Sequence, residues 1–64
     1  MINIHKSSDG QYYFTVSAKN NKVIVTSETY KRKRSALKGI ASIFDNFYDY
    51  RQVLSHPKVK DYTV

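Results

Sequence analysis

The sequence contains no cysteine, no tryptophan, one proline, two glycines and only five acidic residues in 64. Without cysteine, neither disulfides nor zinc bound by thiolates can hold the fold together. His5 and His56 have no carboxylate or second histidine at a recognisable metal-ligand spacing, so we expect no metal and no cofactor. A domain of this size is marginally stable, because it buries only about 60% of the surface of its unfolded chain. Self-association is the remaining supplement, and we therefore expect a homodimer.

Long apolar runs are also absent. No window is apolar over the length that crosses a bilayer, and the first residues lack the apolar stretch of a signal peptide. We therefore expect a cytoplasmic protein with no membrane partner. The hydrophobic fraction of 41% and the aromatic fraction of 14% are sufficient for a folded core, and the length allows one domain, residues 1–64.

Motifs that carry catalysis are missing as well. The sequence has no glycine-rich phosphate loop, and no serine has a predicted histidine–carboxylate pair. Asp45 and Asp49, four residues apart on one helix face, could hold a divalent cation together with His56. Two carboxylates without a glycine-bearing loop or a third ligand are usually ordinary surface residues, however. We expect no catalytic residues and no enzyme.

Three segments near the N-terminus, residues 2–5, 11–18 and 22–27, have the composition and pattern of β-strands. Turn residues separate them: Gly10 and the pair Asn20-Asn21 both tolerate the left-handed backbone conformation. Apolar residues stand at successive positions in Val23-Ile24-Val25, which predicts a strand in the middle of a sheet with both faces covered.

The apolar period becomes helical from Lys31 onward, which predicts a helix that covers the sheet. Gly39 lies inside this helix, where it costs about 1 kcal/mol relative to Ala, so we expect a strand or a partner helix close to it. The helix should break near residues 46–49, and residues 50–54 should form a second helical turn that Pro57 ends. Residues 58–64 have a weak strand pattern.

Over residues 2–45 the sequence resembles the YegP-like family of small bacterial domains. The matching motifs are Ser8–Phe14, Asn20, Val23–Glu28, Tyr30, Lys33, Ala36, Gly39-Ile40 and Ser42-Ile43. The resemblance implies a β-β-β-α-β unit that occurs in tandem or as two subunits, which share one sheet and exchange their C-terminal strands. It implies no biochemical function and no catalytic residues. The sequence departs from the family at Asn20-Asn21, where Asn-Gly is common, and in the longer, more aromatic stretch 47–57.

Together these considerations predict an α+β fold. It consists of a three-stranded antiparallel meander, one helix packed on the sheet, and a short C-terminal strand exchanged between the subunits of a dimer. The candidate interface residues are Gly39, Phe44, Phe47, Val59, Tyr62 and Val64.

The strongest charge feature is a basic cluster at the predicted start of the helix, formed by Lys31, Arg32, Lys33, Arg34 and Lys38. Positive charge there opposes the helix dipole, by about 0.3–1 kcal/mol per charge, so local stability does not explain it. With a formal net charge of +6, we expect a binding protein that contacts nucleic acid or another polyanion through this cluster.

Two other interpretations of these features remain open. In that binding mode Tyr12, Tyr13 or Tyr30 could stack on unpaired bases. Charge runs are usually solvated faces, however, and the neighbouring tyrosines would then only pack the sheet. The alternative function is a protein–protein interaction or accessory module that uses the sheet face and the aromatic C-terminal segment.

Overall fold

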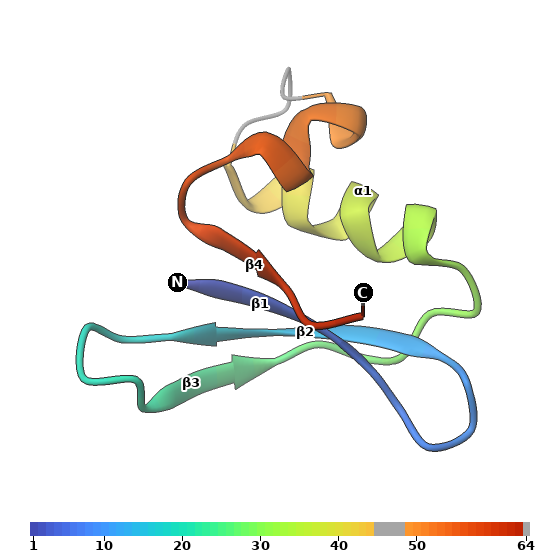
Figure 1. Cartoon of the computed structure of the whole chain (residues 1–64), viewed down its shortest axis with the longest axis horizontal. Coiled ribbons are helices and arrows are strands. Elements are labelled where there is room, and N and C mark those ends of the chain that lie inside the picture. The colour runs from blue at the N-terminus through green and yellow to red at the C-terminus, as the bar shows by residue number, and fades with distance from the viewer. Residues whose placement is uncertain (45–48, 64) are drawn as a thin grey trace.

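The computed structural model describes residues 1–44 and 49–63 (Figure 1). Its elements, in chain order, are β1 (Ile2–Lys6), β2 (Tyr12–Ser17), β3 (Val23–Thr26), α1 (Lys33–Phe44), the 3₁₀-helix η1 (Tyr50–Ser55) and β4 (Val59–Asp61). The α+β class is as predicted. None of the helices in these two ranges is long and apolar enough to cross a membrane.

The four strands form one mixed sheet in the order β3-β2-β1-β4. The pairs β1–β2 and β2–β3 are antiparallel. The last strand lies parallel to β1, with Ile2 opposite Val59 and Ile4 opposite Asp61. Hydrogen bonds at both ends hold it there: the Ile2 N–H donates to the Lys58 carbonyl over 2.8 Å, and the Tyr62 N–H donates to the Ile4 carbonyl over 2.9 Å.

The prediction of a three-stranded antiparallel sheet was therefore wrong, because a fourth, parallel strand completes it. The predicted exchange of the last strand is also unsupported, since β4 finds its partner in its own chain. The reason is the path after α1. Val53 of η1 is fully buried in the core, which turns the chain back over the sheet so that β4 reaches the free edge of β1.

The two turns between the antiparallel strands follow the sequence prediction. Gly10 has a φ of +84°, and its N–H donates to the Ser7 carbonyl over 3.0 Å. Asn21 has a φ of +65°, in the left-handed region that Asn tolerates better than most residues. The Asn21 N–H donates to the Ala18 carbonyl over 2.9 Å.

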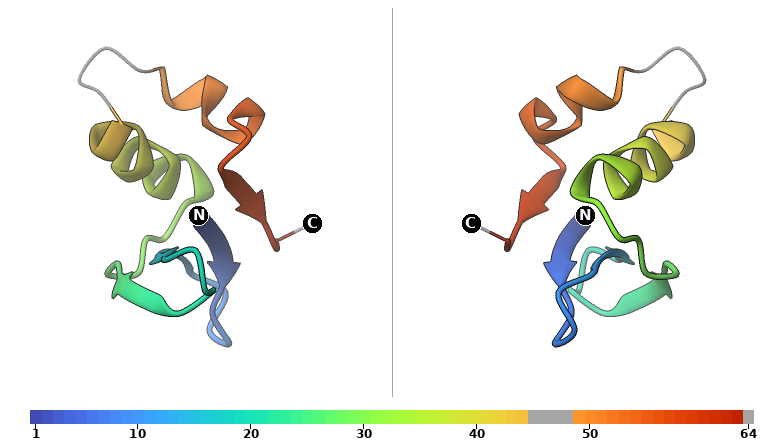
Figure 2. Two further views of the ribbon diagram at one scale, coloured as in Figure 1. Left: turned by 90° about the vertical axis from the view of Figure 1, so that its left-hand side faces the viewer. Right: turned by 90° about the vertical axis from the view of Figure 1, so that its right-hand side faces the viewer.

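The core lies between the sheet and the helices, which are both on one face of the sheet (Figures 1 and 2). It consists of Ile2, Ile4, Phe14, Leu37, Ile40, Ala41 and Val53. Residues at even positions of β1 and β2 point into it, because side chains alternate along a strand. The other face of the sheet, which carries the odd positions of β1 and β2, has no described element against it.

The prediction that Val23-Ile24-Val25 is a central, covered strand was wrong. β3 is an edge strand, and Val23, Ile24 and Val25 are 53%, 65% and 51% exposed. The physical reason is the placement of the helices: α1 packs on β2, and η1 packs on α1 and β4, toward the opposite side of the sheet from β3.

The helical part of the prediction is largely confirmed. The main helix begins at Lys33, two residues later than expected, and η1 covers the predicted second turn. Most of the predicted break, at residues 46–48, lies outside the described residues. The chain leaves η1 at His56, which has an extended backbone, before Pro57.

Candidate functional site

The start of α1 has no capping side chain. Arg32 precedes the helix and offers no acceptor, and the first turn contains no acidic residue. The Arg32 carbonyl accepts from the Ser35 and Ala36 N–H groups over 3.1 and 3.4 Å. In the part of the chain that the structure describes, the N–H groups of Lys33 and Arg34 have no acceptor. The helix therefore presents unsatisfied donors together with the positive end of its dipole.

The five cations of the predicted cluster are not equivalent. Lys33 is half-buried and forms an ion pair with Asp61 over 2.5 Å. Lys38, one turn further on, lies over the Tyr50 ring, 5.2 Å from its centroid. The remaining three, Lys31, Arg32 and Arg34, are exposed, and their side chains form no ion pair with any described residue. Of the five, only these three have their charge fully available.

Asp61 links this cluster to the sheet. It is the last residue of β4, and it accepts hydrogen bonds from the Lys33 ammonium and, over 2.5 and 2.8 Å, from the Thr63 hydroxyl and N–H. Partial burial raises the pKa of Asp61, but the hydrogen bonds from Lys33 and Thr63 outweigh it, and the pKa lies below its ordinary value of 3.8. Asp61 is therefore a carboxylate at neutral pH and fixes the end of β4 beside the first turn of α1.

The predicted interface residues fall in different environments. Gly39 packs against its own chain: a Cβ there would lie 3.0 Å from the Tyr30 hydroxyl and 3.3 Å from the Phe14 ring. The close neighbours of Gly39 are thus side chains of β2 and of the segment after β3 in the same chain. Phe44 stacks on His56, with ring centroids 4.2 Å apart. Val59 packs against the core, and Tyr62 is 59% exposed, while Phe47 and Val64 lie outside the described residues.

The candidate cation site of Asp45, Asp49 and His56 does not form among the described residues. Asp45 lies outside them, and Asp49 caps η1 by accepting from the Arg51 N–H over 2.9 Å. The hydrogen bonds and charge of the Arg51 guanidinium and N–H lower the pKa of Asp49. Within residues 1–44 and 49–63, no three histidine, cysteine or acidic side chains gather as metal ligands would.

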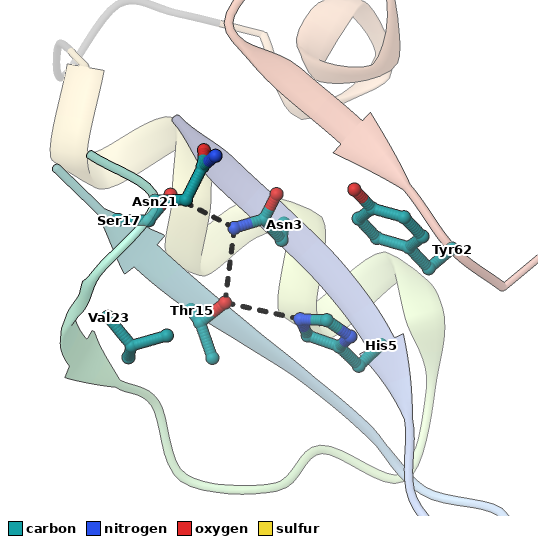
Figure 3. Close-up of a pocket in the computed structure, with 7 residues that line it drawn as sticks. All are labelled: Asn3, His5, Thr15, Ser17, Asn21, Val23 and Tyr62. Carbon is teal, nitrogen blue, oxygen red and sulfur yellow. Dashed lines mark hydrogen bonds between the residues drawn. The ribbon is translucent and has the colours of Figure 1, made fainter. Parts of the chain in front are cut away.

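A second candidate site lies on the open face of the sheet. It is a hollow of about 230 Å³ (Figure 3), lined by Asn3, His5, Thr15, Ser17, Asn21, Val23 and Tyr62. Side chains of β1 and β2 form its floor, with Tyr62 on the β4 side and Val23 on the β3 side. Among the residues that the structure describes, no acidic one lines it. Lys60 lies on the same face, because it is in register with Asn3.

Three rings form a row across this face. His5 stacks on Tyr13, with centroids 5.0 Å apart, and on Tyr62, with centroids 5.4 Å apart and an interplanar angle of 3°. They come from β2, β1 and the residue after β4. Of the tyrosines proposed to stack on bases, Tyr13 is thus already in a stack, Tyr12 lies under the Lys6 ammonium and Tyr30 packs on Phe14. Tyr62 was predicted only as an interface residue.

The floor of the hollow is a hydrogen-bonded network. The Asn3 amide donates to the Thr15 and Ser17 hydroxyls, both over 3.3 Å, and a His5 ring nitrogen lies 3.2 Å from the Thr15 hydroxyl. Thr15 and Ser17 are each only 7% exposed, although no element of residues 1–44 and 49–63 covers this face. The network leaves the side-chain carbonyl oxygen of Asn3 and the side-chain amide of Asn21 without partners among the described residues, and both residues line the hollow.

Comparison with known proteins confirms the resemblance to the YegP-like family. The chain is 48% identical over 45 residues to the UPF0339 protein PA0329 of Pseudomonas aeruginosa, and this match covers 70% of the chain and 41% of PA0329. It is 51% identical over 43 residues to the UPF0339 protein YegP of Escherichia coli, covering 67% of this chain and 39% of YegP.

The chain therefore spans about two fifths of the length of these relatives. The names of these relatives specify no reaction, ligand or partner. No solved structure matches the chain significantly. Residues 7–49 match the sequence model of a family described as a domain of unknown function, DUF1508. With two thirds of its residues inside that match, the chain belongs to the DUF1508 family.

Proposed function

We propose that this chain is a binding protein that contacts nucleic acid or another polyanion through the start of α1. The observation that carries the proposal is the state of three cations. Lys31, Arg32 and Arg34 are exposed and unpaired with any described residue, beside helix N–H groups that lack acceptors. Phosphate oxygens satisfy both kinds of group at once, since they accept from free N–H groups and neutralise cations.

Stability alone does not account for this arrangement. Each cation in the first turn opposes the helix dipole, and adjacent cations repel one another. A Ser, Thr, Asp or Asn at the position of Arg32 would stabilise the helix by about 0.5–2 kcal/mol relative to a residue that cannot cap. A site that binds an anion gives this combination a physical purpose.

The test is a titration of single-stranded nucleic acid at two salt concentrations. If three cations contact phosphates, the slope of log affinity against log salt should be about −2, so affinity should fall about 20-fold between about 50 and 200 mM salt. Replacing Lys31, Arg32 and Arg34 with Gln should abolish binding or bring that slope close to zero. A control with the same charge change, Lys19→Gln, Lys22→Gln and Lys58→Gln, should keep it.

Two results contradict this proposal. One is the absence of binding by the unaltered chain at the lower salt concentration. The other is a control variant that loses as much affinity as the helix variant, because binding would then depend on net charge alone. The same titration with duplex nucleic acid shows whether the phosphates must belong to a single strand.

We further propose that the chain acts as a homodimer joined through β3. Support comes from the edge itself: Val23, Ile24 and Val25 form a run of exposed apolar residues on a strand with one unpaired side. Exposed apolar edge strands pair readily with other strands.

Mass measurement in solution tests the dimer. We expect twice the chain mass for the unaltered protein and a monomer for Ile24→Lys, because a lysine at the edge disfavours strand pairing. Leu54→Lys is the matched control, because this substitution adds the same charge. Leu54 is 44% exposed and lies on η1, away from the β3 edge. A monomer of the unaltered chain contradicts the proposal.

A further inference from the structure

The basic start of α1 and the hollow on the open face meet at the end of β4. Lys33 lies in the first turn of α1 and holds Asp61 on the helix face of the sheet. Side chains alternate along an extended chain, so Tyr62, the next residue, points to the opposite face. Its ring stacks on His5 there. A ligand that binds the cations therefore needs to pass around only one sheet edge to reach Tyr62.

The Tyr62 ring is held in an orientation in which another ring could stack on it. His5 supports it, and His5 is itself supported by Tyr13. Tyr62 lies on the β4 side of the hollow, and it is 59% exposed. A planar ring that enters the hollow can therefore stack on Tyr62.

Polar groups around the hollow suit the edge of such a ring. The Asn3 carbonyl oxygen can accept a hydrogen bond, and the Asn21 amide can donate and accept. Neither is used within the described part of the chain. The volume of about 230 Å³ is below the roughly 300–1,000 Å³ of typical small-molecule sites, so it suits one ring system and not a whole cofactor.

We infer that this hollow binds an unpaired base of a single-stranded nucleic acid, stacked on Tyr62, while the phosphates contact the start of α1. The inference rests on the proposed polyanion binding. It adds that the sheet recognises a base of the ligand, whereas the helix contacts its phosphates. The charge agrees with this occupant, since Lys60 flanks the hollow and none of the described acidic residues lines it. A duplex would not serve, because its bases are stacked inside it and cannot reach a protein ring.

The experiment compares two labelled ligands: a single-stranded oligothymidine, and an abasic oligomer of the same length and charge. Fluorescence anisotropy at low salt measures both affinities for the full chain, for Tyr62→Leu and for Tyr62→Phe. Since stacking of one base on an aromatic residue is worth about 1–3 kcal/mol, the full chain should prefer the oligothymidine by at least about fivefold. Tyr62→Phe should keep this preference, because the ring remains. Tyr62→Leu should lose it while its affinity for the abasic oligomer stays unchanged.

The outcomes separate the two proposals. If neither oligomer binds the full chain, the polyanion proposal fails and this inference fails with it. If both bind equally well, or if Tyr62→Leu keeps the preference, only the base site is wrong. If Tyr62→Leu instead converts a dimer into a monomer in a parallel mass measurement, the open face is a contact between copies and the inference is overturned.

Discussion

Gly39 is the residue whose substitution most directly tests the packing of α1. Ala normally stabilises a helix interior by about 1 kcal/mol relative to Gly. Here its Cβ would lie 3.0 Å from the Tyr30 hydroxyl and 3.3 Å from the Phe14 ring. Phe14 is 5% exposed, and the Tyr30 ring stacks on it with centroids 6.4 Å apart, so the two rings restrain each other. We expect Gly39→Ala to leave the free energy of unfolding unchanged or to lower it by up to about 1 kcal/mol.

Urea unfolding measures this effect, and Ser42→Ala serves as the control. Ser42 is exposed on the same helix, and its hydroxyl donates to the Lys38 carbonyl. Ala should stabilise the helix there by a few tenths of a kcal/mol. A gain of about 1 kcal/mol in Gly39→Ala would mean that its neighbours yield without cost.

Asp61 gives the stability a defined pH dependence. Because its pKa is lowered in the folded state, the folded carboxylate holds its proton less tightly than the unfolded one. The stabilisation is then complete above the unfolded value of about 3.8 and is lost as the pH falls through the lower folded pKa. We expect Asp61→Asn to lower the free energy of unfolding by about 1 kcal/mol at neutral pH, and this difference to vanish in acid.

Urea midpoints from about pH 7 down to about pH 2 measure that difference. Glu28→Gln controls for the lost charge, since Glu28 is exposed and forms no ion pair with a described residue. A difference between the unaltered chain and Asp61→Asn that persists at the acid limit would show that the contribution is not ionic.

Single residues were predictable from sequence where the reason is local. The left-handed turn positions at Gly10 and Asn21 follow from backbone sterics, and the tight neighbourhood of Gly39 follows from its helix cost. The row of Tyr13, His5 and Tyr62 was missed, because its members come from three segments that only the pairing of β1 with β2 and β4 brings together. Tyr13 and His5 stand at odd positions of strands whose even positions are apolar, and this alternation was the available signal for two of the three rings.

At the scale of elements, η1 decides where β4 lies. Val53 is its one buried residue and is fully enclosed in the core. We expect Val53→Ala to destabilise the fold by about 2 kcal/mol, through lost burial and a cavity, and to increase hydrogen exchange of the Tyr62 N–H that bonds to Ile4. Leu54→Ala, next to it but 44% exposed, should change the stability by less than about 0.5 kcal/mol. Equal effects at the two positions would mean that η1 is not anchored through Val53.

The β3 prediction shows why element type is easier to infer than element position. The strand exists where the sequence indicated, but successive apolar residues were interpreted as burial on both faces. In the structure the same residues are exposed at an edge, because α1, which is only 12 residues long, packs over β2 instead. The pattern records that these side chains favour burial, and it does not say whether this chain or another provides it.

For the whole molecule, the net charge of +6 sets opposite salt dependences for the two proposed associations. Two copies repel each other through their charges, and salt screens this repulsion while leaving the apolar contact of β3 intact. We therefore expect the dissociation constant of the dimer to fall as salt rises from about 50 to 200 mM, whereas that of the nucleic-acid complex should rise about 20-fold. Sedimentation and anisotropy in the same buffers measure both constants. A dimer that weakens with salt would be held by ionic contacts, and the apolar edge of β3 would then not be its interface.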